Sequence, residues 1–281
     1  MKSFSDLLIT LLLALACLSP IAFAELREVV VSHADEKGVL QLYRMKEDGS
    51  ESIQLTFSKH GCRMPSVSPD GKKLAYVEQV DHSLAIRVSG LDGLNIKTLT
   101  DGGMNLIPSW FPDSDQLVFM KVNPKPKQDP ARNAKIYFIN LVTGKTRRLF
   151  TDKEQLKYSN AMPVISPKGE QIAFISDRSG EMRVWVSALD GSGAKQLSKP
   201  EKNFHDEIKA PFEQKVPAWS PDGKWIAHWE GVEMIHMSRF TGIPNPKRDQ
   251  LIASTFSVWV VGEDGMGPVS YTHLRAHETN S

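Results

Sequence analysis

The stretch PAWSPDGKWIAHW at residues 217–229 decides the fold, because the chain repeats it. Close copies are PSVSPDGKKLAYV at 65–77, PSWFPDSDQLVFM at 108–120 and PVISPKGEQIAFI at 163–175. Each copy has a proline, three residues, a second proline, a polar pair and then an apolar run. The second prolines lie 43, 55 and 54 residues apart. Self-similarity at such a period indicates a repeat architecture.

One repeat unit predicts four short strands. Proline fixes φ for a tight turn that Asp-Gly completes, and the apolar runs after it, such as KKLAYV, are typical of buried strands. A second element then provides a third strand, a tight turn and a fourth strand. Its copies are QLYRMKEDGSESIQLT (41–56), AIRVSGLDGLNIKTLT (85–100), IYFINLVTGKTRRL (136–149), VWVSALDGSGAKQLS (184–198) and VWVVGEDGMG (258–267). Repeated four-stranded units predict an all-β fold of β-propeller blades.

The repeat also resembles the TolB-like propellers, whose motif reads PxWSPDGxxIAF, over about residues 28–268. The second copy departs from that motif at Phe111 and Ser114 and the third at Lys168, and all three substitutions leave a plausible turn. We expect a propeller domain at 25–270 with about five blades represented, six in the complete protein. The first blade begins at REVVVSH (27–33) and lacks its innermost strand.

Both ends of the chain carry expectations of their own. Lys2, the apolar run at 7–18 and the small-x-small pattern AFA at 22–24 predict a signal peptide over residues 1–24, and hence a periplasmic or secreted protein. The alternative is a lipoprotein anchor at Cys17. Residues 271–281 differ from the repeat, so we expect a non-native tail there and a native chain that is longer.

Composition excludes several classes of partner. The net charge is +1, from 34 basic and 33 acidic residues, which disfavours binding to nucleic acid. After the N-terminus, no apolar segment is long enough to span a bilayer. If residues 1–24 are removed, Cys62 is the single cysteine left, and a lone buried thiol is the simplest interpretation. We expect a monomer.

Three insertions break the repeat, at 123–134, 199–215 and 231–256. Strand direction alternates within a blade, so all three fall at the end of the blades opposite the SPDG and DG turns. Long loops on one face of a repeat scaffold commonly bind ligands. The binding residues predicted on this face have polar or charged side chains: Arg63, Asn160, Arg178, His205, Asp206, Lys215, Glu230, Glu233, His236 and Arg239.

No motif nominates a catalytic residue, since GxSxG and phosphate-binding glycine patterns are absent. We expect a non-catalytic scaffold that recognises an envelope protein or a polysaccharide and needs no cofactor. One alternative is a metal-dependent lyase of the oligogalacturonate type, with a divalent ion near His205 and His236. Another is the propeller part of a prolyl-oligopeptidase-type serine peptidase. His228 is interpreted as a core residue in an aromatic slot, and Trp229 has a sugar-stacking alternative.

Overall fold

The computed structural model describes residues 27–123, 133–197, 213–231, 255–263 and 269–275. The described strands group into five antiparallel blades that follow one another along the chain. The first blade comprises β1 (Glu28–Ala34), β2 (Leu40–Lys46) and β3 (Ile53–Gln54). The second comprises β4 (Cys62–Val67), β5 (Lys73–Val80), β6 (Ser83–Gly90) and β7 (Lys97–Thr98). The third comprises β8 (Met104–Trp110), β9 (Gln116–Val122), β10 (Ala134–Asn140) and β11 (Thr146–Arg148).

The fourth blade comprises β12 (Asn160–Ile165), β13 (Gln171–Ser176), β14 (Arg183–Ala188) and β15 (Lys195–Gln196). A short helical turn, η2 (Gln155–Lys157), precedes it. The fifth comprises β16 (Glu213–Trp219), β17 (Trp225–Gly231), β18 (Thr255–Gly262) and β19 (Val269–Arg275). Within every blade, neighbours in sequence are hydrogen-bonded neighbours in space, and one parallel bridge, Leu84 to Met104, joins the second blade to the third.

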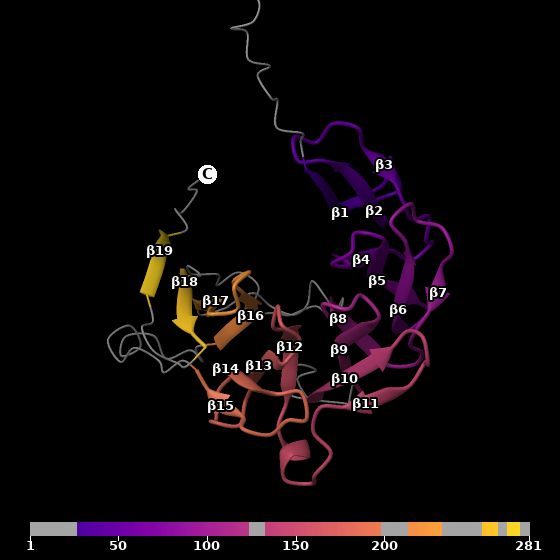
Figure 1. Cartoon of the computed structure of the whole chain (residues 1–281). Helices are drawn as coiled ribbons and strands as arrows, with labels where there is room; N and C mark the ends of the chain where they lie inside the picture. The colour runs from indigo at the N-terminus through magenta and orange to yellow at the C-terminus, as the bar shows by residue number, and fades with distance from the viewer. Residues whose placement is uncertain (1–26, 124–132, 198–212, 232–254, 264–268, 276–281) are drawn as a thin grey trace, which may run out of the picture.

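The blades stand around an open arc, with the first and fifth blades at its two ends (Figure 1). This arrangement confirms the predicted all-β fold of four-stranded units. Three strands of the first blade are described, and the first of them, β1, corresponds to the second strand of the repeat. The number of blades in the complete protein and the closure of the ring stay predictions.

The repeated proline turns form as expected. In the second blade the Gly71 N–H donates to the Ser68 carbonyl at 2.8 Å, and Gly71 has a φ of 69°. Ser114 takes the glycine place in the third blade with a φ of 59°, and its N–H still donates to the Phe111 carbonyl at 3.0 Å. The deviating turn therefore survives in a left-handed conformation that L-residues other than Asn and Asp seldom adopt.

A β-bulge recurs on the innermost strands, directly before the first proline of each repeat. The register of β4, β8 and β12 shifts there, and Met64, Ile107 and Met162 have φ values of 54°, 53° and 50°. A left-handed conformation is costly for L-residues, most of all for a β-branched one such as Ile107. Its recurrence in three blades shows that the fold, rather than local preference, imposes it.

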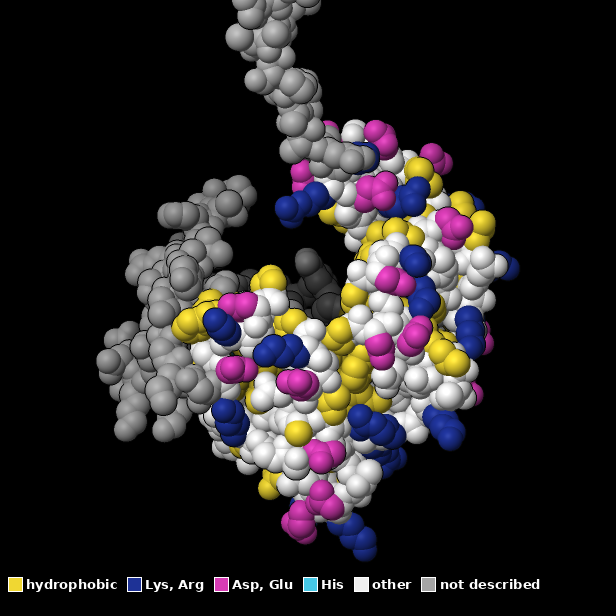
Figure 2. Space-filling model, in the orientation of Figure 1, with side chains coloured by type: hydrophobic (Ala, Val, Ile, Leu, Met, Phe, Trp, Pro, Cys, Tyr) yellow, Lys and Arg dark blue, Asp and Glu magenta, His cyan; other side chains and the backbone are white. Residues whose placement is uncertain are grey.

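Hydrophobic side chains gather along the inner side of the arc (Figure 2).

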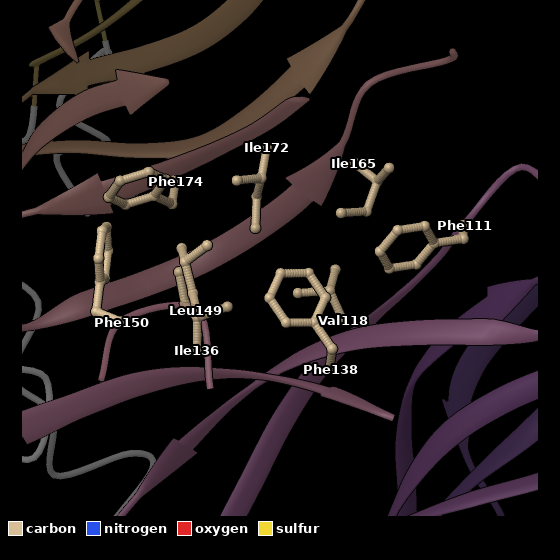
Figure 3. Close-up of a cluster of buried hydrophobic side chains, with 9 residues drawn as sticks. All are labelled: Phe111, Val118, Ile136, Phe138, Leu149, Phe150, Ile165, Ile172 and Phe174. Carbon is tan, nitrogen blue, oxygen red and sulfur yellow. The ribbon is translucent and has the colours of Figure 1, made fainter. Parts of the chain in front are cut away.

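The core lies between blades, where one blade face packs on the next. Figure 3 shows the interface between the third and fourth blades, in which Phe138 and Val118 face Ile172 and Phe174. Phe150 lies edge-on to Phe174, with ring centroids 5.8 Å apart. Side chains at equivalent strand positions build the other interfaces. Successive side chains of a strand point to opposite faces of the blade, so a blade between two others buries side chains on both faces.

Among the described residues, no helix is both long and apolar enough to cross a membrane.

Candidate functional site

The loop face is the end of the blades where the second strand of a blade connects to the third and where the fourth strand leads to the next blade. Three of the predicted binding residues are fully described there: Arg63, Asn160 and Arg178. Lys215 lies in β16 and Glu230 in β17, and only the backbone of these two residues is described. The remaining predicted residues, His205, Asp206, Glu233, His236 and Arg239, lie outside the described ranges.

Arg178 is the best organised of these side chains. It follows β13, and its guanidinium carbon lies 4.6 Å from the ring centroid of Phe150 and 4.9 Å from that of Trp185. The rings of Phe174 and Tyr158 lie 5.5 and 5.6 Å away. Cation–π contacts of this kind are most favourable when the cation is partly desolvated, and Arg178 is half-buried.

Hydrogen bonds fix the orientation of this guanidinium. Its Nε donates to Ser176 Oγ at 3.1 Å, and Nη2 donates to Asn160 Oδ1 at 2.9 Å. Asn160 in turn donates from Nδ2 to the Tyr158 carbonyl at 3.3 Å. The structure therefore brings two of the predicted residues together, Asn160 at the start of β12 and Arg178 just after β13. The two bonds use Nε and Nη2.

Burial lowers the pKa of Arg178, and the negative charge of Asp177 acts in the opposite direction. The guanidinium stays charged at any physiological pH because its ordinary pKa lies so high. Asp177 accepts a hydrogen bond from the Ser159 N–H at 2.8 Å, which ties the loop to the start of β12. The arrangement presents a fixed cation with planar donor geometry, which suits a carboxylate or a carbonyl oxygen.

Phe150, Tyr158 and Trp185 belong to this site, although the sequence did not nominate them. The sequence does hold a signal at Phe150. The first two repeats place Thr56 and Thr100 there, and each threonine Oγ1 accepts a backbone N–H of its own blade at 2.9 Å. In the third repeat the run RLF (148–150) replaces QLT (54–56) and TLT (98–100), so the ring of Phe150 takes the place of the threonine hydroxyl. That ring is one of the two closest to Arg178.

Arg63 lies in another blade, on β4, where its Nη2 donates to Gln79 Oε1 at 3.0 Å. It therefore belongs to the same face as Arg178 but not to the same cluster of contacts.

Three polar residues outside this cluster, Asp35, Cys62 and His228, have structural roles. Asp35 accepts hydrogen bonds from the N–H groups of Lys37 and Val39 at 2.9 Å, which hold a tight turn, and the bond from Val39 is the main cause of its lowered pKa. Cys62 is buried and reduced, and desolvation raises its pKa to about 11, so it is a poor nucleophile. His228 is 3% exposed and occupies the slot of Tyr76, Phe119 and Phe174, as predicted.

The tryptophans mainly join blades. Trp110 Nε1 donates to the Ser66 carbonyl of the preceding blade at 2.8 Å, and Trp219 Nε1 donates to the Val164 carbonyl at 3.3 Å. The side chain of Trp229 is outside the described set, so its sugar-stacking alternative stays a prediction. In the described part of the chain, no three His, Cys, Asp or Glu side chains are grouped to hold a metal ion.

Two curated relatives match part of the chain. An uncharacterized protein of Agrobacterium fabrum is 30% identical over 104 residues, which cover 33% of this chain and 36% of that protein. A TolB homolog of Chlorobium luteolum is 26% identical over 164 residues, or 58% of this chain and 35% of that protein. The matches thus span about a third of the length of each relative. No protein-family model matches the chain.

Solved structures extend the likeness to nearly the whole chain. A putative TolB from Agrobacterium tumefaciens superposes with a TM-score of 0.59 at 20% identity, covering 87% of this chain and 80% of that one. TolB from Acinetobacter baumannii gives 0.62 at 20% identity, covering 88% and 53%. An oligogalacturonate lyase in complex with manganese gives 0.59 at 14% identity, covering 88% and 62%. The open arc of four-stranded blades is therefore the propeller fold of TolB, which a lyase also uses.

Proposed function

We propose that this chain is a non-catalytic binding scaffold of the bacterial envelope, which recognises a protein or a polysaccharide through the loop face. The observation that carries the proposal is the fixed cation at Arg178, held by four aromatic rings and two hydrogen bonds on that face. Arginine and aromatic residues in such surroundings frequently dominate binding interfaces. The likeness to TolB supports the scaffold role by analogy, since one fold serves many functions.

A lyase is the second candidate, because an oligogalacturonate lyase in complex with manganese has the same fold. The histidines that would hold a metal in this chain, His205 and His236, lie outside the described residues. The described loop-face residues offer an arginine and an amide rather than a set of metal ligands. They favour recognition of an acidic or carbonyl group over metal chemistry.

The test begins by identifying the ligand and then uses matched arginine variants. Envelope extract of the native host would be cross-linked to the purified chain, and the protein or glycan recovered would be retested as a pure ligand by calorimetry. Arg178→Gln should weaken binding about tenfold or more, because interfacial arginines of this kind contribute about 1–3 kcal/mol.

Arg147→Gln is the matched control. Arg147 also stacks on a ring, 3.8 Å from the Phe138 centroid, and donates to the Leu189 carbonyl at 2.9 Å, but it lies toward the opposite end of the blade. Burial lowers the pKa of both arginines. Arg178→Gln should lose affinity while it remains folded, whereas Arg147→Gln should keep the affinity of the native chain. Equal affinity in both variants would refute the loop-face proposal, and turnover of oligogalacturonate with added Mn²⁺ would favour the lyase.

A further inference from the structure

The outer turns, which connect the third strand of a blade to the fourth, carry three of the four most exposed large hydrophobic side chains in the described residues. Leu94 and Ile96 in the second blade are 63% and 55% exposed, and Val142 in the third blade is 78% exposed. Single exposed hydrophobic side chains are ordinary on protein surfaces, but several that gather on one surface commonly mark a contact site.

A contact between blades places these two outer turns side by side. Lys97, at the start of β7, donates from Nζ to the Leu141 carbonyl in the turn of the third blade at 3.2 Å. Leu94 and Ile96 lie within three residues of Lys97, and Val142 directly follows Leu141. Strands β7 and β11 lie along the outer side of the arc (Figure 1). The three apolar side chains therefore share one outer corner of the molecule.

Both turns are closed by their own backbone, and their tips protrude. The Gly90 N–H donates to the Leu94 carbonyl at 2.8 Å, and the Asn140 N–H donates to the Lys145 carbonyl at 3.0 Å. Because strand direction alternates in the same way in each blade, these turns stand at the same end of their blades. Protruding tips at one end can meet a flat surface together.

Cations surround the apolar tips. We define the outer-turn patch as residues 91–98 and 141–148, which form the two turns and the fourth strands that follow them. The patch holds one carboxylate, that of Asp92, and four exposed cations, those of Lys97, Lys145, Arg147 and Arg148. Exposed apolar side chains next to lysine and arginine are typical of surfaces that bind anionic bilayers.

Other turns at this end of the blades lack the combination. The outer turn of the first blade carries Glu47 and Asp48, and that of the fourth blade reads DGSGA (190–194), without a large apolar side chain. The turns nearer the centre of the arc carry both charge signs, as in the ion pair of Lys73 with Asp115 at 2.9 Å. The apolar and cationic character is thus confined to the second and third blades.

We propose that the outer-turn patch docks on the surface of an anionic lipid bilayer. The apolar tips enter the boundary between headgroups and acyl chains, and the cations contact the headgroup phosphates. Charge complementarity and the protruding form of the patch favour a bilayer over a polypeptide, whose recognition commonly uses a groove or a sheet edge. The patch lies at the end of the blades opposite the loop face, so this inference does not rest on the proposed function.

Sedimentation of the full chain with lipid vesicles tests the proposal. The chain should bind vesicles of phosphatidylethanolamine and phosphatidylglycerol more tightly than neutral phosphatidylcholine vesicles, and added salt should weaken this binding. Leu94→Ser combined with Val142→Ser should bind the anionic vesicles about tenfold more weakly, because less apolar surface leaves water. Lys97→Gln combined with Lys145→Gln should have an effect of about the same size, since each cation near the bilayer contributes about fivefold.

Matched control variants change the same kinds of side chain on the loop face. Phe57→Ser removes an apolar side chain that is 80% exposed, and Lys59→Gln combined with Lys153→Gln removes two exposed cations. These controls should bind anionic vesicles as the native chain does. All the variants keep the apolar run at 7–18, so any binding through that run is common to them. Equal binding by patch and control variants, or equal binding to neutral vesicles, would overturn the proposal.

A polarity-sensitive dye tests which end of the blades meets the bilayer. Attached to Val142→Cys in a Cys17→Ala background, its emission should shift to the blue with anionic vesicles, whereas a dye on Phe57→Cys should not respond. Cys62 is buried and does not compete for the label. Absence of the shift at Val142→Cys would overturn the proposal, and an envelope protein cross-linked at that position would identify a protein as the occupant instead.

Discussion

The third and fourth blades share a closed interface, whereas among the described blades the first has a neighbour on one side only. Ile172 and Phe174 are fully buried against the third blade. Their equivalents in the first blade are Val29, which is 37% exposed, and Val31, which is half-buried. Both strands pair with the third strand of their own blade, and β13 pairs in addition with β12. This difference in exposure shows that pairing within a sheet sets which side chains share a face, whereas packing against a neighbouring blade buries them.

The largest expected effect comes from truncating one side chain in the fourth blade and its equivalent in the first blade. Phe174→Ala should lower the free energy of unfolding by about 3–5 kcal/mol, because it opens a cavity in the packed interface. Val31→Ala should cost about 1 kcal/mol, since its side chain is only partly removed from water. Urea denaturation measures both. Equal losses would mean that the first blade is covered as fully as the fourth.

Alanine substitutions at two glycines separate the free-energy cost of a clash between blades from the cost of backbone strain. Gly93 and Gly71 have φ values of 80° and 69°, so alanine at either place carries a similar strain of about 1 kcal/mol. A Cβ at Gly93 would lie 2.6 Å from Leu55 O of the first blade, whereas a Cβ at Gly71 meets open space. Gly93→Ala should therefore lose about 1–3 kcal/mol more than Gly71→Ala in thermal or urea unfolding. A smaller difference would show that the first blade shifts easily against the second.

The smallest expected effect concerns Cys62, in the cluster that joins the first and second blades. Desolvation raises its pKa to about 11, above the ordinary value of about 8.5 for an unfolded chain. The unfolded state therefore loses the proton first, and the stability that this thiol contributes falls as the pH rises from about 8.5 to 11. Between pH 8 and 9.5 the stability advantage of the native chain over Cys62→Ala should shrink by about 1 kcal/mol. A pH-independent difference would show that water reaches this interface.

Much of the candidate site was within reach of the sequence. Arg178 and Asn160 were selected because strand alternation places them at the same end of the blade, and the structure brings them within 2.9 Å. The rings around Arg178 were not selected, since Phe150 and Tyr158 follow the third blade whereas Trp185 lies within the fourth. Their meeting depends on how one blade packs on the next, which no spacing along one repeat encodes.

The sequence by itself determined the strands, their turns and the order of the blades. Proline, Asp-Gly and alternating apolar residues act over a few neighbours, so a local pattern is enough to specify them. Even the turn at Ser114 could be predicted on that basis. The tertiary structure alone decided the left-handed bulges at Met64, Ile107 and Met162 and the aromatic surroundings of Arg178. Each of these depends on groups from separate strands or blades, whose contact free energy exists only once the chain has folded.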